Sequence, residues 1–258
     1  MISFIPDARD REQALNALRD RLIGLSDRDG ELVQLARGGV ARFDANRRRE
    51  GKDWPARALS MIGEHRMRQL QRACEFVIES GVPGDFIETG VWRGGACILM
   101  RAVLAAWGVT DRRVWVADSF QGLPPPDPDR YPNDAGSELH AFPQLAVSAD
   151  EVRANFDRHG LLDGQVAFLE GWFRDTLPAA PIERLAILRL DGDMYESTMD
   201  ALVALYGKLS PGGIVIVDDY GILDHCRAAV TDFRRDRAID EPITRIDASG
   251  VHWQKRSG

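Results

Sequence analysis

The sequence predicts an α/β fold whose mostly parallel sheet ends in an antiparallel hairpin. From Phe86 onward, short β-rich runs alternate with amphipathic helical stretches, which is typical of a parallel sheet with crossover helices. The runs at 185–190 and 213–217 are almost wholly apolar, as are central strands that helices cover on both faces. The last two runs are joined by only Ala248 and Ser249, and so short a link can only make an antiparallel hairpin.

Each expected element follows from the spacing of its apolar residues. Along the chain we expect strands at 85–89, 113–118, 165–170, 185–191 and 213–217, helices at 94–107, 149–159, 196–209 and 223–236, and a hairpin that pairs 242–247 with 250–255. Residues 8 to about 50 are charged, and their leucines recur at helical intervals. They predict an N-terminal helical appendage over 1–50, in front of a larger domain over 51–258.

This order of elements indicates a Rossmann-like, seven-stranded methyltransferase sheet rather than a dehydrogenase. The indication is an analogy of architecture, which does not by itself give a function. Residues 119–148 follow the second strand, are rich in Pro and Asp and show no periodicity. A loop of that length in a compact domain is usually a lid or a binding loop, and we expect a lid here.

Composition and charge exclude several classes of protein. The 258 residues suffice for one large domain, or for one domain with an appendage. A net charge of −7 and the lack of a long basic tract argue against binding to the phosphates of a nucleic acid. The longest apolar stretch, 96–107, is broken by Arg101 and is too short for a membrane helix. The charged start carries no secretory signal, so we expect a cytoplasmic protein without a nucleic-acid or membrane partner.

The three cysteines predict neither a disulfide nor a zinc site. Cys74, Cys97 and Cys226 are odd in number and far apart, which fits reduced thiols. His225 stands beside Cys226, but adjacent residues match no usual zinc spacing.

The strongest local signal is the segment 88–95, ETGVWRGG, which ends a strand and opens a helix. Glycines at such a turn let the backbone approach a ligand, and the first amides of the helix are free to donate to it. The alternative is a turn that needs glycine only for its dihedral angles. Asp118 ends the next strand, where doubly wound folds place an acid that binds a ribose diol. Together these features favour nucleoside binding.

S-adenosylmethionine fits the pattern better than a dinucleotide, because the full G-x-G-x-x-G spacing and a basic cluster for a pyrophosphate are both missing. On this interpretation Glu88 and the amides near Gly90 meet the amino-acid end of the cofactor, and Asp118 binds the ribose. Ser119 and Trp172 surround the adenine, although an aromatic residue after a strand more often only packs. The predicted cofactor contacts are Met61, Gly63, Glu88, Thr89, Gly90, Trp92, Gly94, Asp118, Ser119 and Trp172.

Three acids follow the two apolar strands. Asp191 ends one, and Asp218 and Asp219 end the other, so all three meet at the carboxyl edge of the sheet, where open α/β sheets bind ligands. Three anions in one crevice repel one another unless a cation lies between them, and carboxylate oxygens suit Mg²⁺. The sequence therefore predicts a magnesium site at Asp191, Asp218 and Asp219. The alternative is that an aspartate such as Asp193 or Asp219 caps the following helix.

A hydroxyl group that accepts a methyl group must lose its proton. Asp191, which faces the crevice beside the metal, is the leading candidate for the general base. Asp193 and His140, which lies in the expected lid, are lesser candidates. A lone histidine in a loop is more often merely exposed.

Five ordered phrases, GDFIETGVWRGGACI, VWVADSFQGLP, GWFRDTLP, LRLDGDMYESTMDAL and LSPGGIVIVDDY, resemble the macrocin O-methyltransferase family. The resemblance runs from about Trp54 to Trp253 and leaves the charged residues 1–50 outside it. It implies Mg²⁺-dependent methyl transfer from S-adenosylmethionine to a sugar hydroxyl of a macrolide or aminocoumarin antibiotic, by an enzyme that forms a homodimer. It also implies that Asp191, Asp218 and Asp219 hold the metal.

Two rival functions stay open. A metal-dependent methyltransferase that acts on a catechol or phenol would use the same three acids, since sugar specificity rests on the resemblance alone. A catalytically silent protein that binds S-adenosylmethionine could act through its N-terminal helices as an interaction module, although the intact acid triplet argues against it. A nicotinamide dehydrogenase is disfavoured, because the glycine motif that binds a pyrophosphate is missing.

Overall fold

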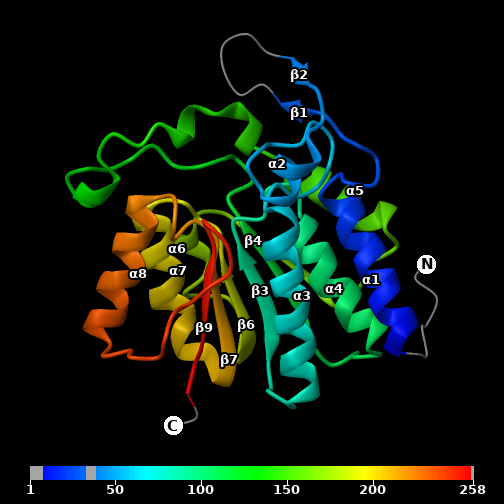
Figure 1. The fold of residues 1–258 in the computed structure, drawn as a ribbon. Coiled ribbons are helices and arrows are strands. Elements are labelled where there is room, and N and C mark those ends of the chain that lie inside the picture. The colour runs from blue at the N-terminus through cyan, green and yellow to red at the C-terminus, as the bar shows by residue number, and fades with distance from the viewer. Residues whose placement is uncertain (1–7, 33–38, 257–258) are drawn as a thin grey trace.

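The computed structural model describes residues 8–32 and 39–256, which form a seven-stranded sheet between two layers of helices (Figure 1). The sheet order is β5-β4-β3-β6-β7-β9-β8, and neighbouring strands run parallel except where β9 pairs antiparallel with β7 and with β8. The strands are β3 (Asp85–Thr89), β4 (Val114–Asp118), β5 (Val166–Glu170), β6 (Leu185–Leu190), β7 (Leu209–Val217), β8 (Thr244–Arg245) and β9 (Val251–Gln254). The predicted sheet with its antiparallel C-terminal hairpin is confirmed, although β8 is shorter than the expected run.

Helices cover both faces of the sheet. One layer contains α1 (Ala8–Leu22), α3 (Gly63–Glu79), α4 (Gly95–Ala106) and α5 (Ala149–Arg158), and the other contains α6 (Phe173–Thr176), α7 (Tyr195–Leu205) and α8 (Asp224–Asp236). Alternate residues of the central strands face the two layers: Phe86 and Ile187 face the first, and Ile87 and Leu188 face the second. Both faces of β6 are therefore buried, as its apolar run predicted.

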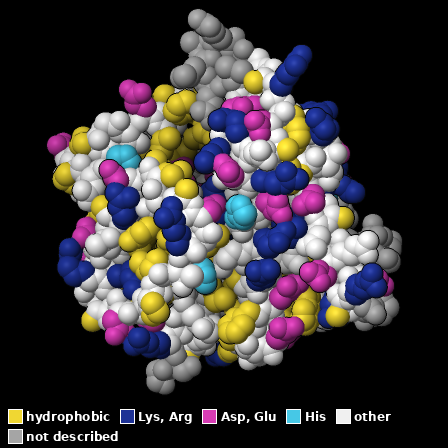
Figure 2. All heavy atoms as spheres, viewed as in Figure 1, with side chains coloured by type: hydrophobic (Ala, Val, Ile, Leu, Met, Phe, Trp, Pro, Cys, Tyr) yellow, Lys and Arg dark blue, Asp and Glu magenta, His cyan; other side chains and the backbone are white. Residues whose placement is uncertain are grey.

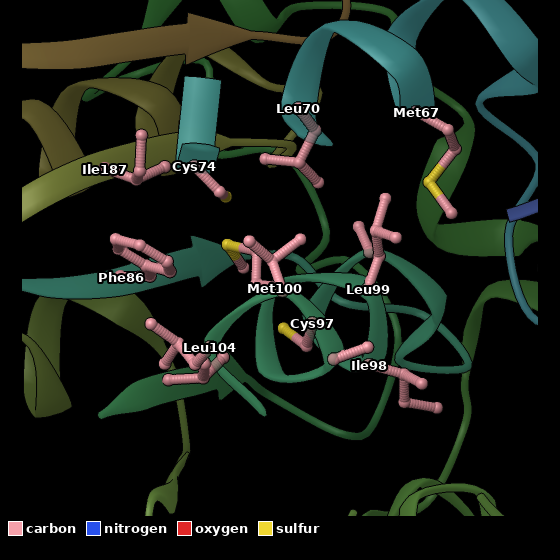
Figure 3. Close-up of a cluster of buried hydrophobic side chains, with 14 of the residues drawn as sticks. Met67, Leu70, Cys74, Phe86, Cys97, Ile98, Leu99, Met100, Leu104 and Ile187 are labelled. Atoms are coloured by element: carbon pink, nitrogen blue, oxygen red, sulfur yellow. The ribbon is translucent and has the colours of Figure 1, made fainter. Parts of the chain in front are cut away.

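The core under the first layer packs α3 and α4 against the sheet (Figure 3). Its labelled members, all fully buried, are Met67, Leu70, Cys74, Phe86, Cys97, Ile98, Leu99, Met100, Leu104 and Ile187. α3 is not among the helices expected from the sequence, although Met67, Leu70 and Cys74 recur at helical spacing. Cys74, Cys97 and Cys226 are all free and buried, in agreement with the prediction of reduced thiols.

The N-terminal region is only partly helical. α1 forms where a helix was expected, but β1 (Glu31–Leu32) and β2 (Val40–Ala41) then pair as short antiparallel strands, and α2 (Ala45–Arg49) follows. Leu15 and Leu22 lie in the same buried core as α3 and α4, so α1 packs on the sheet domain. A domain boundary at residue 50 stays a prediction, and residues 1–7 and 33–38 of that region lie outside the described part of the chain.

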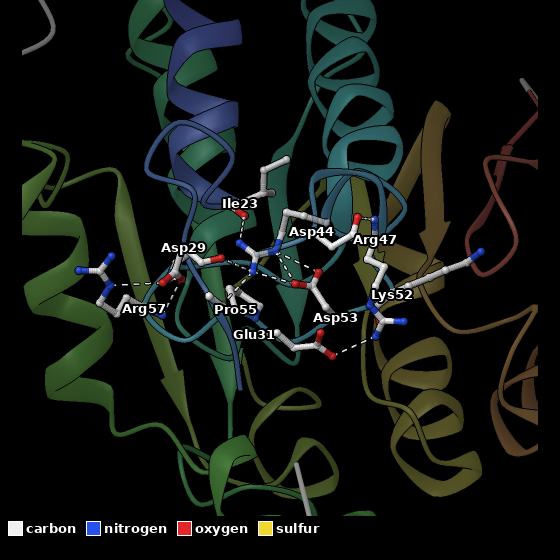
Figure 4. A network of polar contacts seen from close by, with 12 residues as sticks. Ile23, Asp29, Glu31, Asp44, Arg47, Lys52, Asp53, Pro55 and Arg57 are labelled. Atoms are coloured by element: carbon white, nitrogen blue, oxygen red, sulfur yellow. Dashed lines mark hydrogen bonds and ion pairs between the residues drawn. The ribbon is translucent and has the colours of Figure 1, made fainter. Parts of the chain in front are cut away.

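A fully buried arginine organises the segment between α1 and α3. Arg48 forms an ion pair with Asp53, with its Nε 3.0 Å from both carboxylate oxygens, and donates to the carbonyl oxygens of Ile23 and Asp29 at 2.9 Å each. Figure 4 shows how Asp29, Asp53 and the main chain at Ile23 converge in this network. Because the guanidinium has its donors satisfied, its burial is compatible with a stable fold. The network fixes the chain that leads to residues 54–62.

The segment 119–148 consists of turns and three short 3-10 helices, η1 (Pro132–Asp134), η2 (Leu139–Ala141) and η3 (Pro143–Leu145). It extends over the end of the sheet to which the parallel strands point (Figure 1). The indole Nε1 of Trp92 donates to the carbonyl oxygen of Gln144 at 2.8 Å and so holds η3 near the end of β3. Its function as a lid stays a prediction.

On the face drawn in Figure 2, basic and acidic side chains are intermixed rather than gathered by sign. None of the helices in the described ranges is long and apolar enough to span a membrane. The prediction that the chain has no secretory signal concerns residues that lie partly outside the described ones.

Candidate active site

A cavity of about 260 Å³ lies at the carboxyl ends of β3, β4, β6 and β7. Glu88, Asp118, Asp191 and Asp218 reach its wall directly from these strand ends. The 119–148 segment contributes Leu123, Leu139 and Leu145, and the segment between α2 and α3 contributes Trp54 and Met61. The site is therefore placed by the parallel sheet and covered by two segments of irregular structure.

Three residues other than glycine adopt left-handed backbone angles beside this cavity. Trp92 has φ 48°, Phe120 has φ 56° and Asp193 has φ 59°, and each follows the end of a parallel strand. Such angles are unfavourable for residues with a Cβ and persist only where the surroundings impose them, most often at functional sites.

Gly90 joins the glycine turn to the loop after β6. Its φ is +85°, and a Cβ placed on it would lie 1.9 Å from the carbonyl oxygen of Asp191. Glycine is therefore required here both for its dihedral angles and for the close approach of another backbone. The turn that lines one end of the cavity is packed directly on the loop that carries Asp191.

We expect Gly90→Ala to weaken the binding of S-adenosylhomocysteine strongly, because the Cβ must displace one of the two loops at a cost of about 1–3 kcal/mol or more. Isothermal titration calorimetry measures the affinity. Gly81→Ala is the matched control, since Gly81 also has a positive φ, +65°, but a Cβ there would meet nothing within 4 Å. Equal affinities for the two variants would show that the close contact between Gly90 and Asp191 does not affect binding of S-adenosylhomocysteine.

Asp118 braces the glycine turn. Its Oδ2 accepts a hydrogen bond from the amide of Val91 at 2.7 Å, and its Oδ1 accepts one from the amide of Phe120 at 2.7 Å. Burial raises the pKa of Asp118 above its usual value, and these amides oppose the rise by stabilising the charged form. The hydroxyl of Ser119 also lies 3.5 Å from Oδ1, and because a carboxylate can accept about four hydrogen bonds, the predicted contact with a ribose hydroxyl is compatible with this geometry.

A buried arginine lies at the centre of the site. Arg189 on β6 forms ion pairs with Glu88, with Asp218 and, at 2.8 Å, with Asp191. Burial disfavours its charged form, but the three carboxylates outweigh burial and hold its pKa well above the ordinary value. Burial also raises the pKa of Glu88 to about 7, and the thiol of Cys97 donates to Glu88 at 2.9 Å. Arg189 therefore links Glu88, next to the glycine turn, to the acids that follow β6 and β7.

Asp218 is held by two arginines. One oxygen pairs with Arg189 and the other with Arg66 of α3, and Arg66 also pairs with Asp247 at 3.1 Å. Both oxygens of this predicted metal ligand thus have cationic partners in the structure. Burial still raises the pKa of Asp218 to about 6.

Asp191, Asp193 and Asp219 form a cluster in which one carboxylate oxygen from each residue lies within 4.8 Å of those of the other two. Burial and the charge of Asp191 raise the pKa of Asp193 to about 7. Burial and the charge of Asp193 raise the pKa of Asp219 well above its usual value. The Oδ2 of Asp219 is buried and has no hydrogen-bond partner among the residues that the structure describes. Carboxylates this close together repel one another, and a cation between them would relieve the repulsion.

The structure brings most of the predicted site residues together. Those that line the cavity are Met61, Glu88, Gly90, Trp92, Asp118, Ser119, Trp172, Asp191, Asp193, Asp218 and Asp219. Gly63 instead begins α3, Gly94 caps α4, and Thr89 is buried with its Oγ1 near the carbonyl oxygen of Arg189. His140 is exposed in η2 and does not line the cavity.

Sequence reasoning missed Arg189 and Arg66. Arg189 interrupts an otherwise apolar strand, and a charged residue at such a position signals a buried ion pair. For Arg66 no comparable signal exists, because its partner Asp218 lies 152 residues away.

The chain matches one known protein family over almost its whole length. The family described as Macrocin-O-methyltransferase (TylF) matches residues 10–255. The match confirms the resemblance seen in the five phrases. It also shows that the prediction that residues 1–50 lie outside the resemblance is wrong for residues 10–50. These residues include most of α1, whose Leu15 and Leu22 lie in the core, and the buried Arg48.

Individual relatives agree with this match. An enzyme from Streptomyces olivaceus, 8-demethyl-8-(2,3-dimethoxy-alpha-L-rhamnosyl)-tetracenomycin-C 4'-O-methyltransferase, is 52% identical over 249 residues, 96% of this chain and 94% of that protein. Demethyldecarbamoylnovobiocin O-methyltransferase from Streptomyces niveus is 55% identical over 209 residues, 81% of this chain and 80% of that protein. The structure of the O-methyltransferase NovP matches with a TM-score of 0.91 and 48% identity, over 96% of this chain and all of that chain (100%). The chain belongs to the macrocin O-methyltransferase family.

Proposed function

We propose that the protein transfers a methyl group from S-adenosylmethionine to a hydroxyl of a sugar on a glycosylated natural product, with Mg²⁺ in the acidic cluster. The observation that carries the proposal is that one cavity holds both the glycine turn after β3 and the cluster of Asp191, Asp193 and Asp219. The name of the Streptomyces olivaceus relative, which specifies a rhamnosyl 4'-O-methyl transfer, supports a sugar as the acceptor.

The residues at the turn fit the cofactor. Gly90 leaves bare main chain at the cavity wall, and Asp118 holds the amides of the turn in place. Glu88 keeps lone pairs for the amino group of the cofactor beyond its bonds to Arg189 and Cys97. When bound, S-adenosylmethionine supplies a sulfonium methyl group that an oxygen nucleophile can attack in line.

The acidic cluster fits a hard divalent cation. Two features support this proposal: the Oδ2 of Asp219 has no partner among the described residues, and the pKa of Asp193 is raised by burial and by the neighbouring acids. Asp191 and Asp219 would hold the ion, and Asp218 would join them only by giving up an arginine partner. When bound, the ion acidifies and orients an acceptor hydroxyl.

Within this arrangement we assign the general base to Asp193 rather than to Asp191. A carboxylate that coordinates a metal is a weak base, and Asp193 is the neighbouring carboxylate that the proposed ligands Asp191 and Asp219 leave free to accept a proton. It lines the cavity beside Asp191 and is held there in a strained conformation. His140 is exposed and outside the cavity, which argues against its use as a base.

The experiment that tests the function combines binding and transfer. S-adenosylhomocysteine is titrated calorimetrically with Mg²⁺ and again with EDTA, and labelled S-adenosylmethionine is then offered with two acceptors, the rhamnosylated tetracenomycin of the Streptomyces olivaceus relative and catechol. We expect binding in both buffers and transfer to the sugar in Mg²⁺ alone. Transfer to catechol alone would favour the phenol-type enzyme. Binding without transfer to either would favour the silent binding protein, and no binding would overturn the proposal.

The charge of the cluster predicts that Mg²⁺ stabilises the fold more at high pH. Asp193 has a pKa of about 7 and Asp218 of about 6, whereas unfolded aspartate titrates near about 3.9. Without the ion the folded chain keeps protons that the unfolded chain loses, so its stability falls as pH rises from about 4 through 7. Thermal unfolding with Mg²⁺ and with EDTA, well above and well below this window, measures the difference. An increment from Mg²⁺ that does not grow with pH would contradict the cation site.

Two further parts of the proposal rest on the family resemblance and on the sequence. A homodimer is expected, and light scattering of the purified protein measures its mass in solution. A cytoplasmic location is expected, as for an enzyme that uses a metabolic cofactor.

A further inference from the structure

The expected lid, residues 119–148 (the lid segment), carries one wholly buried carboxylate, that of Asp134 in η1. Its side chain has 0% exposure, although its neighbours Asn133 and Ala135 are exposed. A carboxylate loses much favourable hydration on burial, and one that stays buried has hydrogen bonds that replace the water. The burial of Asp134 therefore indicates a specific set of donors.

These donors belong to α7. The Oδ1 of Asp134 accepts from the amide of Tyr195 at 2.7 Å, and its Oδ2 accepts from the amide of Glu196 at 2.9 Å. The first amides of a helix have no acceptor within it, and Met194 at the N-cap position of α7 provides no side-chain hydrogen bond. Asp134 therefore caps α7 from 61 residues away in the chain.

The same turn also contacts the start of α8. The Nδ1 atom of His225 lies 2.5 Å from the carbonyl oxygen of Asn133, and the ring of Tyr131 packs 6.2 Å from that of Tyr195. The loops that precede α7 and α8 carry Asp193 and Asp219. Thus η1 holds the starts of the two helices that follow the acid-bearing loops.

The side chain that depends most on this cap is Asp193. It stands directly before Met194, has φ 59°, and so keeps its conformation only through its surroundings. Asp191 is fixed independently, since its amide donates to the carbonyl oxygen of Thr89 at 2.9 Å. A displaced first turn of α7 would therefore move Asp193 and leave Asp191 in place.

We propose that Asp134 is a positioning residue for methyl transfer. By capping α7 from residues 119–148 it holds the start of α7, and with it the side chain of Asp193, in place at the wall of the cavity. The inference rests on the proposed function, because it assigns the role through Asp193. Within residues 119–148, the η1 turn contacts the starts of α7 and α8, whereas Leu139 and Leu145 line the cavity.

The test compares Asp134→Ala, Asp134→Asn and the control Asp129→Ala, which removes an exposed carboxylate of the same segment. The rate of transfer to the rhamnosylated tetracenomycin is measured with Mg²⁺, together with the affinities for S-adenosylhomocysteine and for Mn²⁺. Amide hydrogen exchange at Tyr195 and Glu196 follows the cap itself. We expect Asp134→Ala to lower kcat by about tenfold, the order expected from the loss of a helix cap, with both affinities close to wild type. Asp134→Asn, which keeps one acceptor oxygen, should restore part of the rate, and Asp129→Ala should change nothing.

Three results would overturn the inference. An unchanged kcat in Asp134→Ala would show that the cap does not serve the reaction, and unchanged exchange at Tyr195 would show that there is no cap. A parallel loss of Mn²⁺ and cofactor binding would show a general structural role instead, and if the alanine variant does not fold, the asparagine variant carries the comparison. A wild-type protein that transfers to no acceptor would overturn the proposed function itself, which is a different outcome.

Discussion

Replacing Arg189 by methionine is expected to lower the free energy of unfolding by about 3–5 kcal/mol, because a buried ion pair that loses one partner leaves an uncompensated charge. Here the single guanidinium balances Glu88, Asp191 and Asp218, and its side chain is only 1% exposed. Methionine is unbranched and uncharged but shorter than arginine, so the expected effect is mainly electrostatic, with a smaller part from the lost guanidinium volume. Urea unfolding, with and without S-adenosylhomocysteine, measures it.

Arg153→Met is the matched control for this measurement. Arg153 pairs with Glu170 at a partly exposed position, and such pairs contribute only about 0–1 kcal/mol. If the methionine variant of Arg189 fails to fold, Arg189→Lys keeps the charge and is expected to retain part of the stability. Equal stabilities of the two methionine variants would show that Arg189 does not hold the site together.

Replacing Asp193 by asparagine is expected to lower kcat by about 100- to 10,000-fold, the range for loss of a general base. Asparagine has nearly the same shape but cannot accept the proton. The affinities for S-adenosylhomocysteine and Mn²⁺ should stay close to wild type, because the glycine turn, Asp191 and Asp219 are unchanged. Single-turnover transfer and calorimetry measure the two properties.

Asp191→Asn supplies the contrast that separates a base from a ligand. We expect this variant to lose Mn²⁺ binding together with turnover, while cofactor affinity stays. If Asp193→Asn lost Mn²⁺ binding as completely as Asp191→Asn, Asp193 would be a metal ligand and the assignment of the base would be wrong.

The position of the site could be predicted from the sequence because the sheet determines it. Residues at the carboxyl ends of adjacent parallel strands must meet at one edge, so the approach of Asp191 and Asp219 follows once their strands are identified. The same argument places Glu88 and Asp118 beside them. Periodicity is enough for this level of prediction, since it identifies the strands and their order in the sequence.

The partners of these acids could not be predicted, because they depend on side-chain directions. Arg66 reaches Asp218 from α3 and Asp134 reaches Tyr195 from an irregular turn, and neither contact leaves a local pattern. His140 is a candidate by its residue type and its place in the expected lid, but an aperiodic segment gives no indication of which way a side chain points. The missed helix α3 is different, because its apolar spacing was present in the sequence.

The packing of the N-terminal region has a consequence for chimeric enzymes. The amides of Leu59 and Ser60 donate to the carbonyl oxygen of Leu22 at 2.9 and 3.0 Å, and the carbonyl oxygen of Leu59 accepts from the amide of Gly95 at 3.0 Å. The end of α1 thus supports, through two hydrogen-bonded steps, the start of the helix that follows the glycine turn. An exchange of N-terminal segments between relatives to alter acceptor preference would therefore have to transfer α1 and the Arg48 network as one block. A junction at residue 50 would combine two halves of a single packed unit.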